Sequence, residues 1–238
     1  QLNELPREYI NIYKKVFPPL KVAGRPLDLW ENRPYHLWGM QPDKGDDSYC
    51  LFGIFDLDGK GKRNVKLNLD EIYARSTDHE TKNEVPGKYL LWDFWNEELL
   101  ESDKHELDIA MPNKSCNLFA LRKYTGEPQL LGTNGHFSIG AIETSNVKWD
   151  AASQTLTGNA KGNGGDTVTL FFHIPDGFQM LKGEVDGAIN QDIKVENRIL
   201  ALRIPASRTF LSFSLKFVGR VDTTSERDFV KGVAAHKY

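Results

Sequence analysis

The stretch "DTVTLFFHIP", Asp166–Pro175, decides how this chain folds, because its apolar residues recur at every second position. The alternating apolar residues are Val168, Leu170, Phe172 and Ile174. Successive side chains of a β-strand point to opposite faces of a sheet, so this period of two predicts a half-buried antiparallel strand. The stretch "TFLSFSLKFV", Thr209–Val218, repeats the pattern and predicts a second strand of the same kind.

The same kind of pattern extends back to Pro26, as short apolar runs separated by turn residues. Strands do not alternate with helical segments, which excludes a doubly wound sheet or a (β/α)8 barrel. One segment differs: in "LPREYINIYKKVFPPL" the apolar residues recur at steps of three and four, which predicts a helix that ends before Pro18. The predicted fold is therefore all-β, with two tandem antiparallel β-sandwich-like domains and one N-terminal helix.

A change in composition at "RKYTGEPQLLGTNGH" predicts a domain boundary near residues 125–130. We therefore divide the sequence into three parts. Residues 1–25 form the helix and a linker, residues 26–127 the first β-sandwich domain, and residues 128–238 the second.

The composition excludes two classes of partner. The chain has 238 residues, is 39% hydrophobic and carries a formal net charge of -3. No block of like charges predicts nucleic-acid binding, and no apolar run approaches the roughly 20 residues of a membrane-spanning helix. The compartment stays open, and export to the periplasm or the medium is one alternative.

No motif predicts a catalytic residue, a metal site or a cofactor. The six histidines and the two cysteines, Cys50 and Cys116, lack the spacing of metal ligands. Asp93 and Glu97, if on one strand, would lie about 13 Å apart, beyond the separation of a glycosidase carboxylate pair. His136 in "GTNGHFSIG" is interpreted as a structural histidine with satisfied hydrogen bonds rather than as a base. These residues leave open whether the chain belongs to an enzyme.

The segment "KYLLWDFWNEELL", Lys88–Leu100, combines aromatic residues with carboxylates. Both faces of the corresponding strand are largely apolar, which predicts a central strand covered on both sides, with Trp92 in the core. Asp93 on such a strand needs a polar partner. We predict that Arg25, in "AGRPLDLW", is this partner and that the two residues form a structural polar pair.

Aromatic side chains beside carboxylates are also typical of sugar-binding sites. Tryptophan offers a large flat surface with a polar edge, although in most proteins it is largely buried. The candidates for carbohydrate binding are Trp30, Trp38, Trp95 and Trp149. The alternative for each of them is a place in the core.

Several phrases occur in an order that resembles one enzyme family. They are "VFPPLKVAGRPLDLWENRPYHLW", "YCLFGIFDLDG", "VKLNLDEI", "KYLLWDFWNEELL", "LDIAMPNKSCNLFALR" and "GEPQLLGTNGHFSIGAIE". Together they resemble the C-terminal β-sandwich region of bacterial glycoside hydrolases of the α-galactosidase-like (melibiase) clan, over roughly residues 5 to 145. Residues 146–238 would form a further β domain.

The resemblance implies a non-catalytic role for this part of such an enzyme. The catalytic aspartates of the clan lie on a (β/α)8 barrel whose motifs have no match here, so no catalytic residue is carried over. The helix over residues 6–17 would be the tail of that barrel, and Gln1 would then not be the biological start. The barrel of the same polypeptide is the implied partner, with an oligosaccharide as a second. The alternatives are an independent carbohydrate-binding module and an extracellular adhesion or interaction protein.

Overall fold

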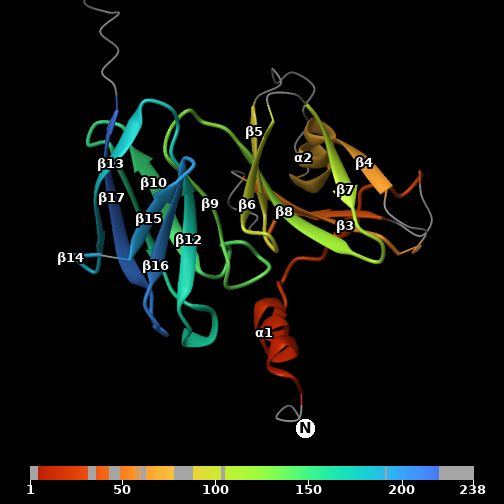
Figure 1. Cartoon of the computed structure of the whole chain (residues 1–238), viewed down its shortest axis with the longest axis horizontal. Helices are drawn as coiled ribbons and strands as arrows, with labels where there is room; N and C mark the ends of the chain where they lie inside the picture. The colour runs from red at the N-terminus through yellow and green to blue at the C-terminus, as the bar shows by residue number, and fades with distance from the viewer. Residues whose placement is uncertain are drawn as a thin grey trace, which may run out of the picture.

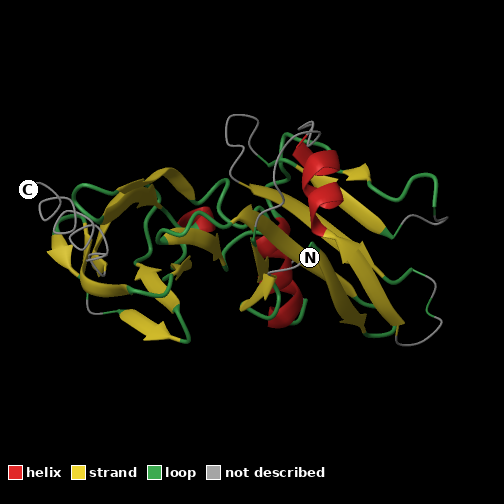
Figure 2. Cartoon of the chain, turned by 90° about the horizontal axis from the view of Figure 1, so that it is seen from above, coloured by secondary structure: helices red, strands yellow, loops and turns green. Residues whose placement is uncertain are grey.

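The computed structural model describes residues 5–31, 36–42, 49–57, 59, 63–77, 88–102, 105–190 and 192–219. Within these residues, antiparallel strands form four sheets and there are two α-helices (Figure 1). The predicted all-β class is therefore confirmed. Seen from above, the strands gather toward the two ends of an elongated molecule (Figure 2).

The first group of strands forms one large sheet and one small sheet. Its strands are β1 (Arg25–Pro26), β2 (Leu37–Met40), β3 (Tyr49–Phe55), β4 (Arg63–Asn68), β5 (Tyr89–Asp93), β6 (Glu98–Ser102), β7 (Glu106–Met111) and β8 (Cys116–Lys123). The large sheet has the order β1-β2-β3-β8-β5-β6, and β4 pairs with β7. Leu67 of β4 and Ile109 of β7 pack in one core with Phe52 and Phe119 of the large sheet.

A second helix, α2 (Leu69–Thr77), corrects the prediction that the N-terminal helix stands alone. Asn68 caps its start, because its Oδ1 accepts the backbone N–H of Glu71 at 3.1 Å. Ile72 and Tyr73 are buried in the first core. The helix is only nine residues long and directly follows β4, so its period could not be separated from that of the strand.

Strand β5 is buried along its whole length, as the sequence predicts. It lies between β8 and β6 in the large sheet. Tyr89 and Leu91 pack in the first core, whereas Leu90 and Trp92 belong to a different cluster on the opposite face. The predicted core position of Trp92 is confirmed, with 1% of its surface exposed.

The second group of strands forms a five-stranded and a four-stranded sheet. Its strands are β9 (Gln129–Thr133), β10 (Thr144–Asp150), β11 (Thr155–Ala160), β12 (Val168–His173), β13 (Phe178–Val185), β14 (Ala188–Ile189), β15 (Ile193–Glu196), β16 (Ile199–Ile204) and β17 (Leu211–Gly219). The sheet orders are β10-β11-β17-β13-β14 and β15-β16-β12-β9. Phe172 of β12 and Phe213 of β17 meet in the core of this group, with ring centroids 5.6 Å apart. The chain passes from the first group to the second between β8 and β9; a domain boundary after residue 127 stays a proposal.

The stretch "DTVTLFFHIP" forms β12, but only one half of the prediction for it is right. Leu170 and Phe172 face the core of the second group, as expected. The opposite face is not exposed to solvent, because Phe171 and His173 on it are buried as well. Strand β17, by contrast, is half-buried as predicted, with alternating buried and more exposed residues.

The two groups of strands share a packed interface, which explains the second buried face of β12. This junction cluster consists of Tyr49, Leu51, Leu90, Trp92, Phe94, Ala120, Leu131, Ile139 and Phe171. The rings of Trp92 and Phe171 lie at its centre, 4.5 Å apart. Aromatic pairs at this distance contribute packing energy beyond their buried area. The interface therefore joins β5 of the first group to β12 of the second.

Candidate functional site

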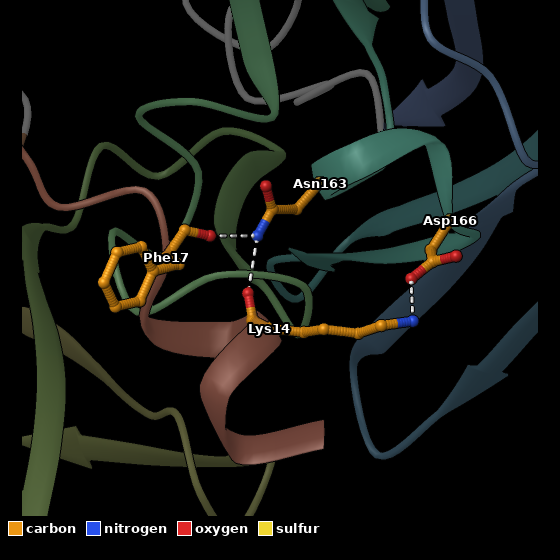
Figure 3. Close-up of polar contacts among 4 residues, drawn as sticks. All are labelled: Lys14, Phe17, Asn163 and Asp166. Carbon is orange, nitrogen blue, oxygen red and sulfur yellow. Dashed lines mark hydrogen bonds and ion pairs between the residues drawn. The ribbon is translucent and has the colours of Figure 1, made fainter. Parts of the chain in front are cut away.

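The second group of strands holds the C-terminal end of α1 (Arg7–Val16), as Figure 3 shows. Asn163 Nδ2 donates to the carbonyl oxygens of Lys14 at 2.7 Å and of Phe17 at 2.8 Å. Lys14 Nζ forms an ion pair with Asp166 at 2.9 Å. The last carbonyls of a helix have no partner within the helix, so Asn163 supplies a C-terminal cap.

Lys15 places the same helix end at the junction of the two groups. Its carbonyl oxygen accepts the backbone N–H of Phe137 at 2.8 Å. Its ammonium group lies 5.0 Å from the ring centroid of Phe94 and 5.7 Å from that of Trp95, a cation–π arrangement. Phe94 and Trp95 follow β5, whereas Phe137 belongs to the second group. Helix α1 therefore contacts both groups through its last turn.

Asn163→Ala is expected to loosen α1, because two carbonyl oxygens lose their donor. Each such hydrogen bond contributes about 1 kcal/mol. We expect hydrogen exchange of the amides in the last turn of α1 to accelerate about fivefold or more. Asn190→Ala is the matched control, since Asn190 also donates to a carbonyl, that of Arg203 at 3.0 Å. The control should leave exchange in α1 unchanged; equal acceleration in both variants would contradict the capping role.

The apolar stripe of α1 is exposed although the helix end is anchored. Its residues and their exposed fractions are Leu5 (47%), Tyr9 (55%), Ile12 (49%), Tyr13 (43%) and Phe17 (47%). No residue of α1 is buried. If the helix is the tail of a barrel, as the resemblance implies, it is expected without that barrel to dock on the first sandwich or to be poorly ordered. In the structure it docks by polar contacts, mainly on the second group, and its apolar stripe takes little part in the docking.

An apolar hollow lies next to the last turn of α1 and brings two of the candidate tryptophans together. It has a volume of about 220 Å³ and is lined by Val16, Trp38, Phe55, Trp95 and Phe137, among others. Trp38 comes from β2, and Trp95 from the turn after β5. Nearly all the lining side chains are apolar, which suits contact with protein side chains better than contact with hydroxyl-rich sugars.

A larger groove with a volume of about 710 Å³ lies between the two groups of strands. Its walls are formed by the ends of β3 and β8, the connection over residues 124–128, and strand β10. Trp149, a third candidate, lines this groove. The fourth, Trp30, is 88% exposed in the turn after β1 and lines neither depression. The four tryptophans therefore do not form one site.

Asp93 and Arg25 make contacts different from those predicted. The carboxylate of Asp93 accepts the backbone N–H groups of Trp95 at 3.0 Å and Asn96 at 3.1 Å, and the side-chain amide of Asn96 at 2.8 Å. Arg25 donates to the carbonyl of Ser76 at 3.0 Å. β2, β3 and β8 separate β1 from β5 in the sheet. Asp93 is thus satisfied by the turn that follows it, a local arrangement typical of aspartate.

A buried polar cluster lies just beyond β9. His136 Nδ1 accepts the N–H of Ser138 at 3.1 Å, so the ring proton is on Nε2, which donates to the carbonyl of Pro18 at 2.9 Å. This confirms a structural histidine, and burial lowers its pKa. The Ser138 hydroxyl donates to Glu143 Oε2 at 3.3 Å. Glu143 is fully buried, which raises its pKa to about 7.

The two cysteines are both free and lie in different environments. Cys50 is buried in the first core, where burial raises the pKa of its thiol to about 12. Cys116 is exposed at the start of β8. Burial of the Cys50 thiol suppresses the reactive thiolate.

Sequence reasoning missed Asn163, Asp166 and Glu143. Asn163 and Asp166 lie in the loop "GNGGD", where Gly164 and Gly165 have positive φ values of 66° and 89°. Its role in holding α1 leaves no local signal, because Asn163 and Lys14 are 149 residues apart. Within the described ranges, no group of three or more His, Cys, Asp or Glu residues could hold a metal ion. Among these same residues, no helix is long and apolar enough to cross a bilayer.

Comparison with known proteins does not assign the chain to a family. No protein-family model and no curated protein matches it. A solved structure of Arthrobacter globiformis T6 isomalto-dextranase complexed with panose matches with a TM-score of 0.28 and 10% sequence identity. The match covers 85% of this chain and 37% of that chain. This chain thus spans well under half of that structure, and membership of the α-galactosidase-like clan is not shown.

Proposed function

We propose that this chain is a non-catalytic β-domain region of a glycoside hydrolase of the α-galactosidase-like clan. In this role it supports a catalytic (β/α)8 barrel, which packs against the apolar stripe of α1. The observation that carries the proposal is that α1 is fixed at one end while its apolar stripe stays exposed. An exposed apolar patch on a helix is typical of a protein contact surface.

The anchoring of α1 supports this role because it gives the helix a defined direction. Asn163 and the Lys14–Asp166 ion pair hold the last turn without covering the stripe. The apolar hollow continues the stripe, since Val16 of α1 is one of its lining residues. The stripe and the hollow together form one apolar surface for a partner. Because the helix already has a fixed direction, less conformational entropy is lost on association.

The order of the sequence phrases supports the choice of partner. The phrases that resemble the clan begin at the helix and continue through β9. In the clan the last helix of the barrel leads into the β-sandwich, and α1 holds the corresponding position here. The catalytic carboxylates would then lie on the barrel and not on the strands described above.

The reading frame upstream of the Gln1 codon tests the proposal directly. We expect it to encode, in frame, a (β/α)8 barrel with acidic residues at the carboxyl ends of its strands. A start codon at or just before Gln1, with no barrel upstream, would overturn the proposal and favour an independent module or an interaction protein.

Ile12→Asp is expected to have little effect on the stability of this chain alone. It should destabilise the joined protein, in which the barrel and this chain form one polypeptide. In the chain alone Ile12 is 49% exposed, so the free energy of unfolding should change by no more than about 0.5 kcal/mol. In the joined protein the new carboxylate would be buried against the barrel, which should lower the Tm by about 5 °C or more.

Val195→Asp is the matched control, because Val195 is also an exposed aliphatic residue (54%) but lies on β15, away from α1. The control should shift the Tm equally in both proteins. Equal shifts for Ile12→Asp in the two proteins would contradict docking through α1. A separate chain that sediments as a dimer, and as a monomer after Ile12→Asp, would assign the stripe to a second copy instead.

A further inference from the structure

The ring of Trp149 is fixed in place where it lines the groove. Phe178 and Phe217 meet it edge-on, with ring centroids 5.6 Å and 5.8 Å away. Trp149 is half-buried, packs against the core of the second group and is one of the residues that line the groove. An indole held in this way offers an apolar surface to a ligand at little cost in conformational entropy.

Polar residues line the same groove. Ser145, Asn146 and Lys148 come from β10, and Glu127 comes from the opposite wall. Their hydroxyl, amide, ammonium and carboxylate groups include both hydrogen-bond donors and acceptors. A pyranose ring has apolar C–H faces and a rim of hydroxyl groups, so it is matched by an aromatic surface with polar groups beside it.

The backbone adds further polar groups, because the groove is lined by two outer strands. β10 is one of the two outer strands of the five-stranded sheet, and β9 is one of the two of the four-stranded sheet. Outer strands carry N–H and C=O groups that take no part in the sheet ladder. The register of β10 shifts between Ser145 and Lys148, and Asn146 has a φ of 54°. Bulges of this kind turn side chains toward binding sites.

The opposite wall of the groove is held in place by hydrogen bonds within the protein. The side-chain oxygen of Gln129 accepts both the N–H and the hydroxyl of Thr125 at 3.0 Å. Its amide nitrogen donates to the carbonyl of Lys123 at 3.1 Å. These bonds close the connection over residues 124–128 into a fixed loop, so binding does not have to order it.

Of the four charged residues that the structure describes along the groove, two are engaged by the protein itself. Arg122 donates to the carbonyl of Leu131 at 2.9 Å and lies over the ring of Tyr49 at 3.8 Å. The Lys123 ammonium lies over the ring of Tyr73 at 4.8 Å. Both cations keep their charge but are directed toward these protein partners, and the other two charged lining residues, Lys148 and Glu127, carry opposite charges. Glu127 is also the one carboxylate among the described lining residues, so the groove lacks a hydrolytic pair.

From these observations we infer that the groove binds a neutral oligosaccharide without cleaving it, with the Trp149 indole as the stacking surface. The volume of about 710 Å³ lies in the range of sites for ligands larger than a single small group. The inference is independent of the docking of a barrel on α1, because the groove and the apolar hollow beside α1 share none of their described lining residues.

Binding of tri- to hexasaccharides of glucose, galactose, mannose and xylose to the whole chain tests the inference. Isothermal titration calorimetry would be used, with a trigalacturonate as the acidic comparison. We expect at least one neutral oligosaccharide to bind and Trp149→Ala to weaken it about tenfold or more. The double variant S145A/K148A changes two groove side chains outside the core and should weaken binding about two- to tenfold.

Trp30→Ala and Trp95→Ala are the matched controls, since both remove a tryptophan outside the groove, and both should bind like the wild type. Should Trp149→Ala fail to fold, Trp149→Phe and S145A/K148A decide the question, because they spare the packing. The inference is overturned if no panel member binds the folded chain at millimolar concentration. It is also overturned if groove variants bind unchanged, or if trigalacturonate binds best. If no oligosaccharide binds, the tests of the proposed function, which are the upstream reading frame and the Ile12→Asp variant, keep their meaning.

Discussion

Trp92→Ala is expected to lower the free energy of unfolding by about 3–5 kcal/mol, because it leaves a large cavity at the junction of the two groups. Trp92 is 1% exposed, and its ring lies 4.5 Å from that of Phe171 in the junction cluster, at an interplanar angle of 31°. Neighbouring side chains come from both groups, so neither group alone can relax into the space. Urea unfolding followed by circular dichroism measures the loss.

The control for this substitution is Trp30→Ala, which removes the same side chain at a position that is 88% exposed. Its effect should stay within about 0.5 kcal/mol. We also expect the unfolding curve of Trp92→Ala to broaden or split, because the two groups lose their shared packing. A loss below about 1 kcal/mol for Trp92→Ala would show that the interface does not bind the groups together.

Glu143→Gln is expected to stabilise the protein above pH 7 and to leave it nearly unchanged near pH 4.5. Burial raises the pKa of Glu143 from 4.5 to about 7, so the folded chain keeps a proton that the unfolded chain releases. The contribution of the neutral carboxyl is complete below pH 4.5 and is lost as the pH rises through about 7. The full difference is on the order of 3 kcal/mol.

The free energy of unfolding of both proteins, measured between pH 4 and pH 8.5, tests this expectation. The difference between wild type and Glu143→Gln isolates this carboxyl from the buried histidines His136 and His173. Glu8→Gln on the exposed surface of α1 is the control and should give parallel curves. A difference that is constant across the pH range would show that Glu143 does not titrate within it.

The strands could be predicted from sequence wherever one period dominates. The alternation in "TFLSFSLKFV" predicted the half-buried β17, and the doubly apolar "KYLLWDFW" predicted the fully buried β5. Helix α2 was missed because nine residues directly after a strand give too few turns to establish a period. The buried second face of β12 was missed because it depends on a partner surface, that of Trp92, more than 70 residues away.

The functional surfaces were harder to predict, because each depends on residues that are distant in sequence. The four tryptophans could be named as candidates, but not separated into one for the groove, two for the hollow and one exposed alone. Asp93 accepts hydrogen bonds from Trp95 and Asn96, whereas the predicted partner was Arg25. Local side chain–backbone bonds of aspartate compete strongly with distant ion pairs, and the apolar pattern gives no sign of them.

The cap on α1 forms late during synthesis of the chain. Helix α1 leaves the ribosome before Asn163, which follows Lys14 by 149 residues. At about 5–20 residues per second, the donor that closes the helix emerges roughly seven to thirty seconds later. A ten-residue helix is marginal in water without tertiary support. During that interval the apolar stripe belongs to a nascent segment that cannot yet hold its final direction, which makes it a natural contact for a chaperone on the growing chain.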